Sequence, residues 1–146
     1  MRESFIELVN KVSKIIPLGE INQDLGDICA ISNYVKLGEV GNNGLENNYT
    51  LSVEEIINFD GSFSDTIEIN CNCNNEANLE TSIFFNSIIE LCKKISLSLD
   101  FPLPENFYNL LIDGKSVRFN SNHRFHTYIS FSHSKIKHIK ITFTKE

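Results

Sequence analysis

The residues best suited to chemistry lie near the carboxyl end of the chain. His126, Tyr128, His138 and Lys140 are even-numbered residues in two stretches that alternate apolar and polar side chains. Side chains two residues apart in a strand point to the same face, so we expect these four to share one surface. Two histidines and a lysine can act as acid, base and phosphate clamp in metal-free cleavage of RNA or another phosphodiester.

The spacing of these residues matches no catalytic motif with a known mechanism. The sequence contains no two-histidine H-x-[ST] pair and no H-E-x-x-H, G-x-S-x-G or P-loop motif. A histidine on an exposed strand is usually an ordinary polar surface residue. We therefore predict a chain that is not an enzyme, has no catalytic residue and binds no cofactor. A small ribonuclease or phosphodiesterase using these four residues is the alternative.

Binding of nucleic acid is a further alternative for the same surface. Basic side chains beside an exposed aromatic ring are the ingredients of a base-stacking platform. The basic residues in question are Arg118, Arg124, Lys137, Lys140 and Lys145. Against it, the rest of the chain is strongly acidic and should repel a polyanion, so nucleic acid is not the expected partner.

The net charge of −6 is unevenly divided along the chain. Residues 1–113 hold 18 acidic residues against six Lys and Arg, a net −12, whereas residues 114–146 hold one acid against seven, a net +6. An acidic body steers basic protein partners toward it. We therefore expect opposite ends of opposite charge, and a basic partner bound by acids of the 38–76 segment. The predicted binding residues are Glu39, Glu46, Glu54, Asp60, Asp65, Glu68 and Glu76.

The hydrophobic pattern predicts one α+β domain over residues 1–146, with antiparallel hairpins packed against amphipathic helices at about 3–16 and 79–99. One hairpin alternates around Asp60-Gly61-Ser62, so that Phe59 opposes Phe63. Glu55 and Asp65 are exceptions on its apolar side. The other hairpin turns at 134–136, so that Phe131 opposes Ile139.

Three segments are harder to interpret. Residues 28–37 fit either a helix or a strand, and we favour the strand. Residues 38–48 are rich in Gly and Asn and predict a mobile loop. Residues 107–112 fit a strand leading to a turn at Asp113-Gly114, although residues 105–111 also fit a short helix.

The four cysteines, at positions 29, 71, 73 and 92, do not suggest disulfides or a metal site. Cys71 and Cys73 occupy the apolar positions of an alternating strand, where a free thiol packs as a small hydrophobic group. A C-x-C pair distant from the histidines lacks the usual spacing of a zinc site. We predict core thiols and no metal.

Four features of the sequence together form a profile typical of certain small proteins. They are the absence of a catalytic motif, the acidic α+β pattern, the lack of a signal peptide and the richness in Asn, Ile and Ser. In that profile the chain resembles the small immunity proteins of bacterial polymorphic toxins, including those of contact-dependent growth inhibition. The resemblance implies a cytoplasmic antidote, away from membranes, that binds one cognate toxin domain, often a nuclease with a positive cleft, and occludes it. It transfers no individual residue, and the basic carboxyl-terminal region departs from a uniformly acidic inhibitor.

Overall fold

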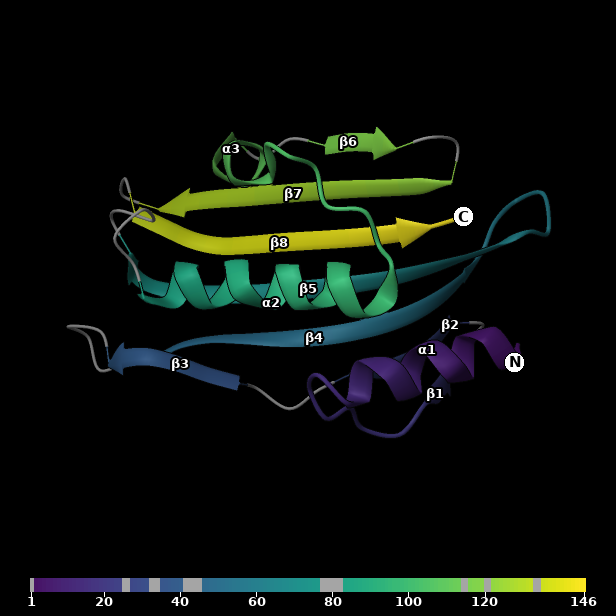
Figure 1. Cartoon of the computed structure of the whole chain (residues 1–146). Helices are drawn as coiled ribbons and strands as arrows, with labels where there is room; N and C mark the ends of the chain where they lie inside the picture. Colours follow the sequence, from purple (N-terminus) through teal and green to yellow (C-terminus); the bar gives the residue numbers. More distant parts are fainter. Residues whose placement is uncertain are drawn as a thin grey trace.

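Long strands with alternating apolar residues form the centre of the protein, because each has one face that must be buried. The computed structural model describes residues 2–24, 27–31, 35–40, 46–76, 83–113, 116–119, 122–132 and 135–146. The described strands form one eight-stranded antiparallel sheet in the order β1-β2-β4-β5-β8-β7-β6, with β3 also paired to β4 (Figure 1). They are β1 (Asn22–Asp24), β2 (Asp27–Ile31), β3 (Val35–Val40), β4 (Glu46–Ile57), β5 (Phe63–Glu76), β6 (Ser116–Phe119), β7 (His123–Ser132) and β8 (Lys135–Lys145).

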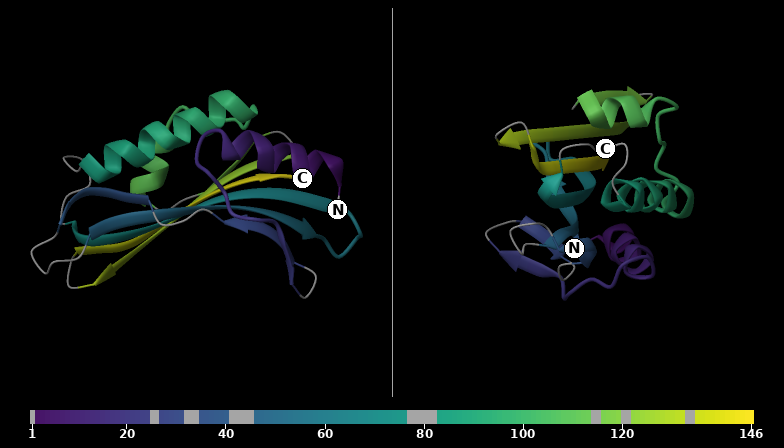
Figure 2. Two further views of the ribbon diagram at one scale, coloured as in Figure 1. Left: turned by 90° about the horizontal axis from the view of Figure 1, so that it is seen from below. Right: turned by 90° about the vertical axis from the view of Figure 1, so that its left-hand side faces the viewer.

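The described helices all cover the same face of this sheet. They are α1 (Glu3–Ser13), α2 (Ile83–Leu99) and α3 (Phe107–Asp113). Figure 2 shows them on one side, with no described helix on the other. The core lies between the two layers, and its fully buried side chains include Phe5, Val12, Leu51, Ile67, Ile69, Ile88, Ile95, Phe125, Ile139, Ile141 and Phe143. The α+β prediction is confirmed, and both predicted helices are present.

The buried cysteines behave as apolar core residues. Cys71 and Cys92 are both buried free thiols, as the alternation predicted for Cys71. Burial raises the pKa of Cys92 to about 12, so this thiol stays protonated near neutral pH. The side chains of Cys29 and Cys73 lie outside the described part of the structure. In the described residues, no helix is both long and apolar enough to cross a membrane.

The two long hairpins have the predicted faces but a different register. Ile57 opposes Phe63 and Leu51 opposes Ile69, which shifts the predicted pairing of β4 with β5 by two residues. The turn is Asn58-Phe59-Asp60-Gly61, closed by Gly61 N–H donating to the Asn58 carbonyl at 3.0 Å. Gly61 has a φ of +82°, so it takes the left-handed position that follows a type I turn in three-residue hairpin loops.

The carboxyl-terminal hairpin differs in the same way. Ile129 opposes Ile139 and Ser132 opposes Lys135, so the chain reverses earlier than the predicted 134–136 loop. A register irregularity between Ser130 and Phe131 accommodates this reversal. Because both registers shift by an even number of residues over the central strands, every side chain keeps its predicted face.

Other boundaries also differ from the prediction. Helix α1 ends at Ser13, three residues early, because Pro17 lacks an N–H and obstructs the carbonyl four residues before it. Ile15 and Ile16 still pack against the core, which explains why their spacing resembled helix. Helix α2 is described from Ile83, and residues 79–82 lie outside the described residues.

One interpretation of the harder segments needs correction, and one open alternative is decided. Residues 38–40 and 46–48 are strand and not loop, since β3 pairs with the first residues of β4, as in Leu37 with Asn47, while 41–45 lie outside the described residues. This pairing satisfies their backbone groups and outweighs the turn preference of Gly and Asn. Residues 107–113 form helix α3, which buries Leu111 against β7. The favoured strand at 28–37 is confirmed where described, in β2 and β3.

Candidate binding face

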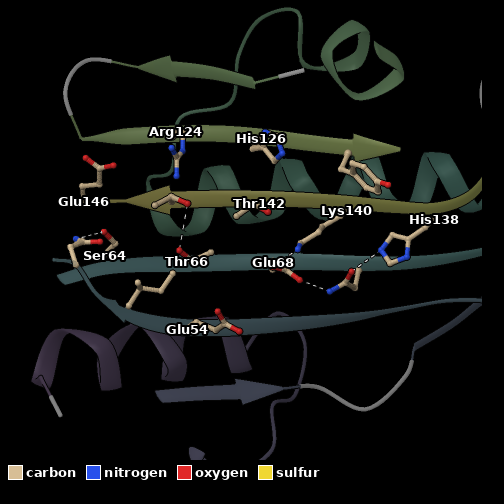
Figure 3. Close-up of a pocket in the computed structure, with 15 residues that line it drawn as sticks. Glu54, Ser64, Thr66, Glu68, Arg124, His126, His138, Lys140, Thr142 and Glu146 are labelled. Atoms are coloured by element: carbon tan, nitrogen blue, oxygen red, sulfur yellow. Dashed lines mark hydrogen bonds and ion pairs between the residues drawn. The ribbon is translucent and has the colours of Figure 1, made fainter. Parts of the chain in front are cut away.

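The side of the sheet away from the helices is hollowed across its four central strands. We define the open face by the residues that line this hollow. They are the even-numbered residues of four segments, 54–58 (the end of β4 and Asn58), 64–70 in β5, 124–128 in β7 and 138–144 in β8, together with Glu146. The hollow has a volume of about 730 Å³. Figure 3 shows its side chains projecting from all four strands toward the viewer. Alternation places these residues here because the odd-numbered residues of the same strands fill the core.

The four residues of the predicted alternative site all lie on the open face. Tyr128 is half exposed, and its ring meets that of His138 edge to face, with centroids 6.5 Å apart. His126 is exposed, while His138 and Lys140 are partly buried. The β7–β8 register puts Tyr128 directly beside Lys140. The alternation of the sequence was sufficient to predict that these residues share a surface.

A chain of polar contacts links β5 to β8 across the open face (Figure 3). His138 Nε2 lies 2.8 Å from Asn70 Oδ1, and the Asn70 amide nitrogen donates to Glu68. Glu68 in turn forms an ion pair with Lys140, with Oε2 and Nζ 3.6 Å apart. Because the NH2 group of the Asn70 side chain points to Glu68, the side-chain oxygen of Asn70 points to His138. An amide oxygen can only accept, so His138 Nε2 is the donor of this hydrogen bond. The network therefore fixes the orientation of His138.

The two histidines are on the same face but not close together. His126 opposes Thr142 and His138 opposes Ser130, an offset of four residues. Four residues of strand span about 13 Å. A general acid and a general base must each come within hydrogen-bond reach of the same substrate group. The arrangement gives His126 and His138 no shared reaction centre, although each could contact a different part of a large partner.

The acids predicted to bind a partner fall on different surfaces. Glu54 and Glu68 lie on the open face, and Asp60 lies in the turn beside it. Asp65 lies on the helix-covered side of β5, so the acids do not form one continuous surface. The side chains of Glu39, Glu46 and Glu76 lie outside the described part of the structure.

Asp65 belongs to an internal charge cluster. Arg2 Nε donates to Glu55 Oε2 at 2.8 Å, and its Nη2 donates to Asp65 Oδ1. The guanidinium also lies over the Phe63 ring, 4.7 Å from its centroid. Burial raises the pKa of Asp65, and the neighbouring Arg2 only partly offsets that effect. The sequence marked Glu55 and Asp65 as exceptions on the apolar side of the hairpin, but nothing in their spacing identified Arg2 as their partner.

The charge split along the sequence does not become two opposite ends of the molecule. The acidic strand β5 pairs with the basic strand β8, so acids and bases lie side by side across the open face. Glu54 and Glu68 occupy the β4–β5 half, while Arg124 and Lys140 occupy the β7–β8 half with both histidines. The sequence reasoning did not anticipate this pairing, because strand order depends on contacts between distant segments.

Several residues of the open face were not singled out by sequence. They are small or uncharged side chains such as Asn58, Ser64, Thr66 and Thr144, of which Ser64, Thr66 and Thr144 are buried. Thr66 and Thr144 are neighbours on β5 and β8, with hydroxyl oxygens 3.4 Å apart. Their even numbering was the only available signal. Among the described residues, no group of three or more His, Cys, Asp or Glu is arranged to hold a metal ion.

Comparison of the chain with protein-family models, with curated proteins and with solved structures finds no match. Arguments about function therefore rest on the chemistry and geometry of the open face.

Proposed function

We propose that this chain is a non-catalytic cytoplasmic binding protein that neutralises a partner protein by covering it, as an immunity protein covers its toxin. The observation that carries the proposal is the shape and chemistry of the open face. It is hollowed, no described helix covers it, and charged and aromatic side chains line it. A hollowed face with an exposed aromatic ring and polar groups around it can receive a convex surface of a folded protein, with polar contacts at the rim.

The charge pattern favours a protein over a nucleic acid. The β4–β5 half of the open face carries Glu54 and Glu68, and the β7–β8 half carries Arg124 and Lys140 with Glu146 at its edge. Because Lys140 is paired with Glu68, the contrast between the halves rests mainly on Glu54 and Arg124. A nucleic acid carries charge of one sign and would meet repulsion over the first half. A protein surface with basic groups over β4 and β5 and acidic groups over β7 and β8 would match both halves. The overall charge of −6 further favours a cationic partner, such as the positive cleft of a nuclease toxin.

The contacts on the open face also favour binding over catalysis. Glu68 forms an ion pair with Lys140, and Asn70 hydrogen-bonds His138, so these two of the four residues of the alternative site are engaged within the protein. The wide separation of His126 from His138 leaves no acid–base pair at one point. A ribonuclease or phosphodiesterase that used His126 and His138 as acid and base would need both side chains within hydrogen-bond reach of the same phosphate.

We expect the gene immediately upstream of this chain's gene to encode a protein that ends in a toxin domain, and the test uses that domain as the partner. Its binding is measured by surface plasmon resonance at low and at moderate salt, and its toxic activity is measured with and without the chain. We expect tight binding, loss of toxic activity, and association at least about ten-fold slower for the double variant Glu54→Lys/Glu68→Lys at low salt. The difference should shrink at moderate salt, because salt screens exposed charges.

A matched variant controls for the change in net charge. Glu7→Lys/Glu105→Lys alters the total charge equally but places both changes in the helix layer, where both residues are exposed. Its association should stay within about three-fold of wild type. Absence of binding by the wild-type chain overturns the proposal, and equal effects of the two double variants overturn the assignment of the open face.

A further inference from the structure

The turn between β4 and β5 carries several large apolar side chains that remain exposed, with Phe59 at its apex. We call residues 56–63 the hairpin tip. Phe59 is exposed to 114% of its reference area, Ile57 to 55% and Ile56 to 42%, and Phe63 is also exposed. The tip projects beyond the helices at one end of the sheet (Figures 1 and 2). Clusters of large exposed apolar side chains in a small protein commonly mark sites of interaction.

The hairpin tip is held in one conformation by its own hydrogen bonds. Asn58 N–H donates to the Ser62 carbonyl at 2.8 Å, and the Asn58 side-chain amide donates to the hydroxyls of Ser62 and Ser64 at 3.0 and 2.9 Å. Ser62 donates from its backbone N–H and its hydroxyl to Asp60 Oδ1, at 2.9 and 2.5 Å. Gly61 supplies the left-handed residue. A tip ordered before binding loses little conformational entropy on contact with a partner.

The negative charge at the hairpin tip favours a protein partner over a second copy of this chain or a lipid surface. The hydrogen bonds from Ser62 lower the pKa of Asp60, so its carboxylate is ionised near neutral pH. Residues 37–92 contain no Lys, Arg or His. The cation described at the tip is Arg2, whose guanidinium lies over the Phe63 ring and is bound to Glu55 and Asp65. A second copy would bring two Asp60 carboxylates together, and a lipid surface would have to take in a carboxylate next to Phe59. A protein pocket bordered by basic side chains meets neither penalty.

The hairpin tip is continuous with the open face. Ile56 and Asn58 line the hollow, whereas Phe59 follows at the apex of the turn. A partner seated on the open face therefore lies within reach of Phe59 without any rearrangement of this chain. Interfaces are dominated by a few large side chains that fill pockets, with charged contacts around them.

We propose that the hairpin tip is the anchor of the interface, with Phe59 inserted into an apolar pocket of the partner protein and Asp60 paired with Lys or Arg at the rim. The inference rests on the proposed function and deepens it, because it names the element that provides affinity where the open face provides charge matching.

The test compares Phe59→Ala and Asp60→Asn with Leu97→Ala, in the full chain, against the same upstream-encoded domain. Leu97 is 88% exposed on α2, so its substitution removes a large exposed apolar side chain from the helix layer. Phe59→Ala should weaken binding at least about 30-fold, as expected for an interface anchor, while its thermal midpoint stays that of wild type. Asp60→Asn should slow association and reduce its salt dependence. Leu97→Ala should bind within about two-fold of wild type.

The possible results separate the two proposals. Equal binding by wild type and Phe59→Ala, with Glu54→Lys/Glu68→Lys impaired, overturns the anchor and leaves the proposed function intact. No binding by wild type overturns both. Sedimentation velocity and flotation with vesicles of neutral or anionic phospholipid complete the test. A dimer or vesicle association lost in Phe59→Ala would assign the hairpin tip to a second copy or to lipid, and would overturn the anchor.

Discussion

Arg2 is the residue on which the charged side chains beneath the helix layer depend. The Glu55 side chain is only 1% exposed and the Asp65 side chain 14%, and both carboxylates are bound by the same guanidinium. A carboxylate in such a place is costly unless a cation and hydrogen bonds compensate for lost water. The two acids face each other across β4 and β5, which makes their mutual repulsion part of what Arg2 must offset.

We predict that Arg2→Ala lowers the free energy of unfolding by about 2 kcal/mol at pH 7, because it leaves buried carboxylates without a partner. Urea unfolding measures this difference. The deficit should shrink as the pH falls toward 4. Burial already raises the pKa of Asp65, and removal of Arg2 raises it further. A carboxyl whose pKa is raised by folding favours the folded state at low pH and loses that contribution as the pH rises through the raised value.

The control for this prediction is Lys14→Ala, which removes an exposed cation from the residue after the same helix. It should change stability by less than about 0.5 kcal/mol at either pH. A deficit for Arg2→Ala that matches the control, or that is equal at pH 4 and pH 7, would mean that the cluster is not held by the arginine.

At the residue scale, the sequence predicted which side chains share a face but not which ones touch. Glu55 and Asp65 stood out because they occupy apolar positions of an alternating pattern. Their partner is Arg2, which lies 53 residues from Glu55 and 63 residues from Asp65, at the start of helix α1. Spacing within a strand carries no information about such a contact, since it depends on how helix α1 packs on the sheet.

At the element scale, the turn between β4 and β5 sets the register of the whole amino-terminal half of the sheet. Alternation makes only even shifts compatible with a buried core, which leaves several registers possible. Gly61 selects among them because it occupies the left-handed position of the turn. The sequence prediction placed Gly61 at the centre of the loop and not at its end, and this displacement accounts for the two-residue error.

We predict that Gly61→Ala destabilises the protein by about 1 kcal/mol, because an L side chain at positive φ is strained. A Cβ at this position meets no atom within 4 Å, so the substitution tests backbone conformation without a steric clash. Gly61→Asn should cost less, since Asn tolerates the left-handed region better than Ala does. Urea unfolding of the two variants provides the measurement. Equal stability of Gly61→Ala and wild type would contradict the role of this turn.

The helix α3 and strand β3 illustrate the limits of local preference. Helix α3 begins with Phe107 N–H donating to the Pro104 carbonyl at 3.0 Å, and Thr127 Oγ1 of β7 donates to the Leu110 carbonyl at 2.8 Å. Both contacts lie outside the turn pattern that suggested a hairpin. Strand β3 forms in a Gly-rich segment because β4 offers it a partner. In both cases, packing between elements decides the structure.

At the scale of the whole molecule, strand order determines the electrostatic character of the open face. A chain with an acidic first part and a basic last part suggested two separate poles. The pairing of β5 with β8 joins the two hairpins at the centre of the sheet and interleaves their charges. The antiparallel class was predictable from alternation and turns, whereas the neighbour relation between distant strands was not, because nothing local encodes it.

This arrangement yields a prediction about nucleic acid. The wild-type chain should not bind a single-stranded RNA of about 20 nucleotides at low salt, because the acidic β4–β5 half lies beside the basic half and the net charge is −6. The variant Glu54→Lys/Glu68→Lys reverses two charges on the open face and brings the net charge from −6 to −2. Its basic side chains would then span all four strands around Tyr128, as in a stacking platform.

We expect this double variant to bind the same RNA with a dissociation constant of about 10⁻⁴ M or tighter, and with affinity that falls as salt rises. Fluorescence anisotropy measures both proteins, and Glu7→Lys/Glu105→Lys controls for net charge. RNA binding by wild type would mean that the acids of the open face do not oppose a polyanion, and equal binding by the two double variants would mean that total charge, and not the pattern across the sheet, governs recognition.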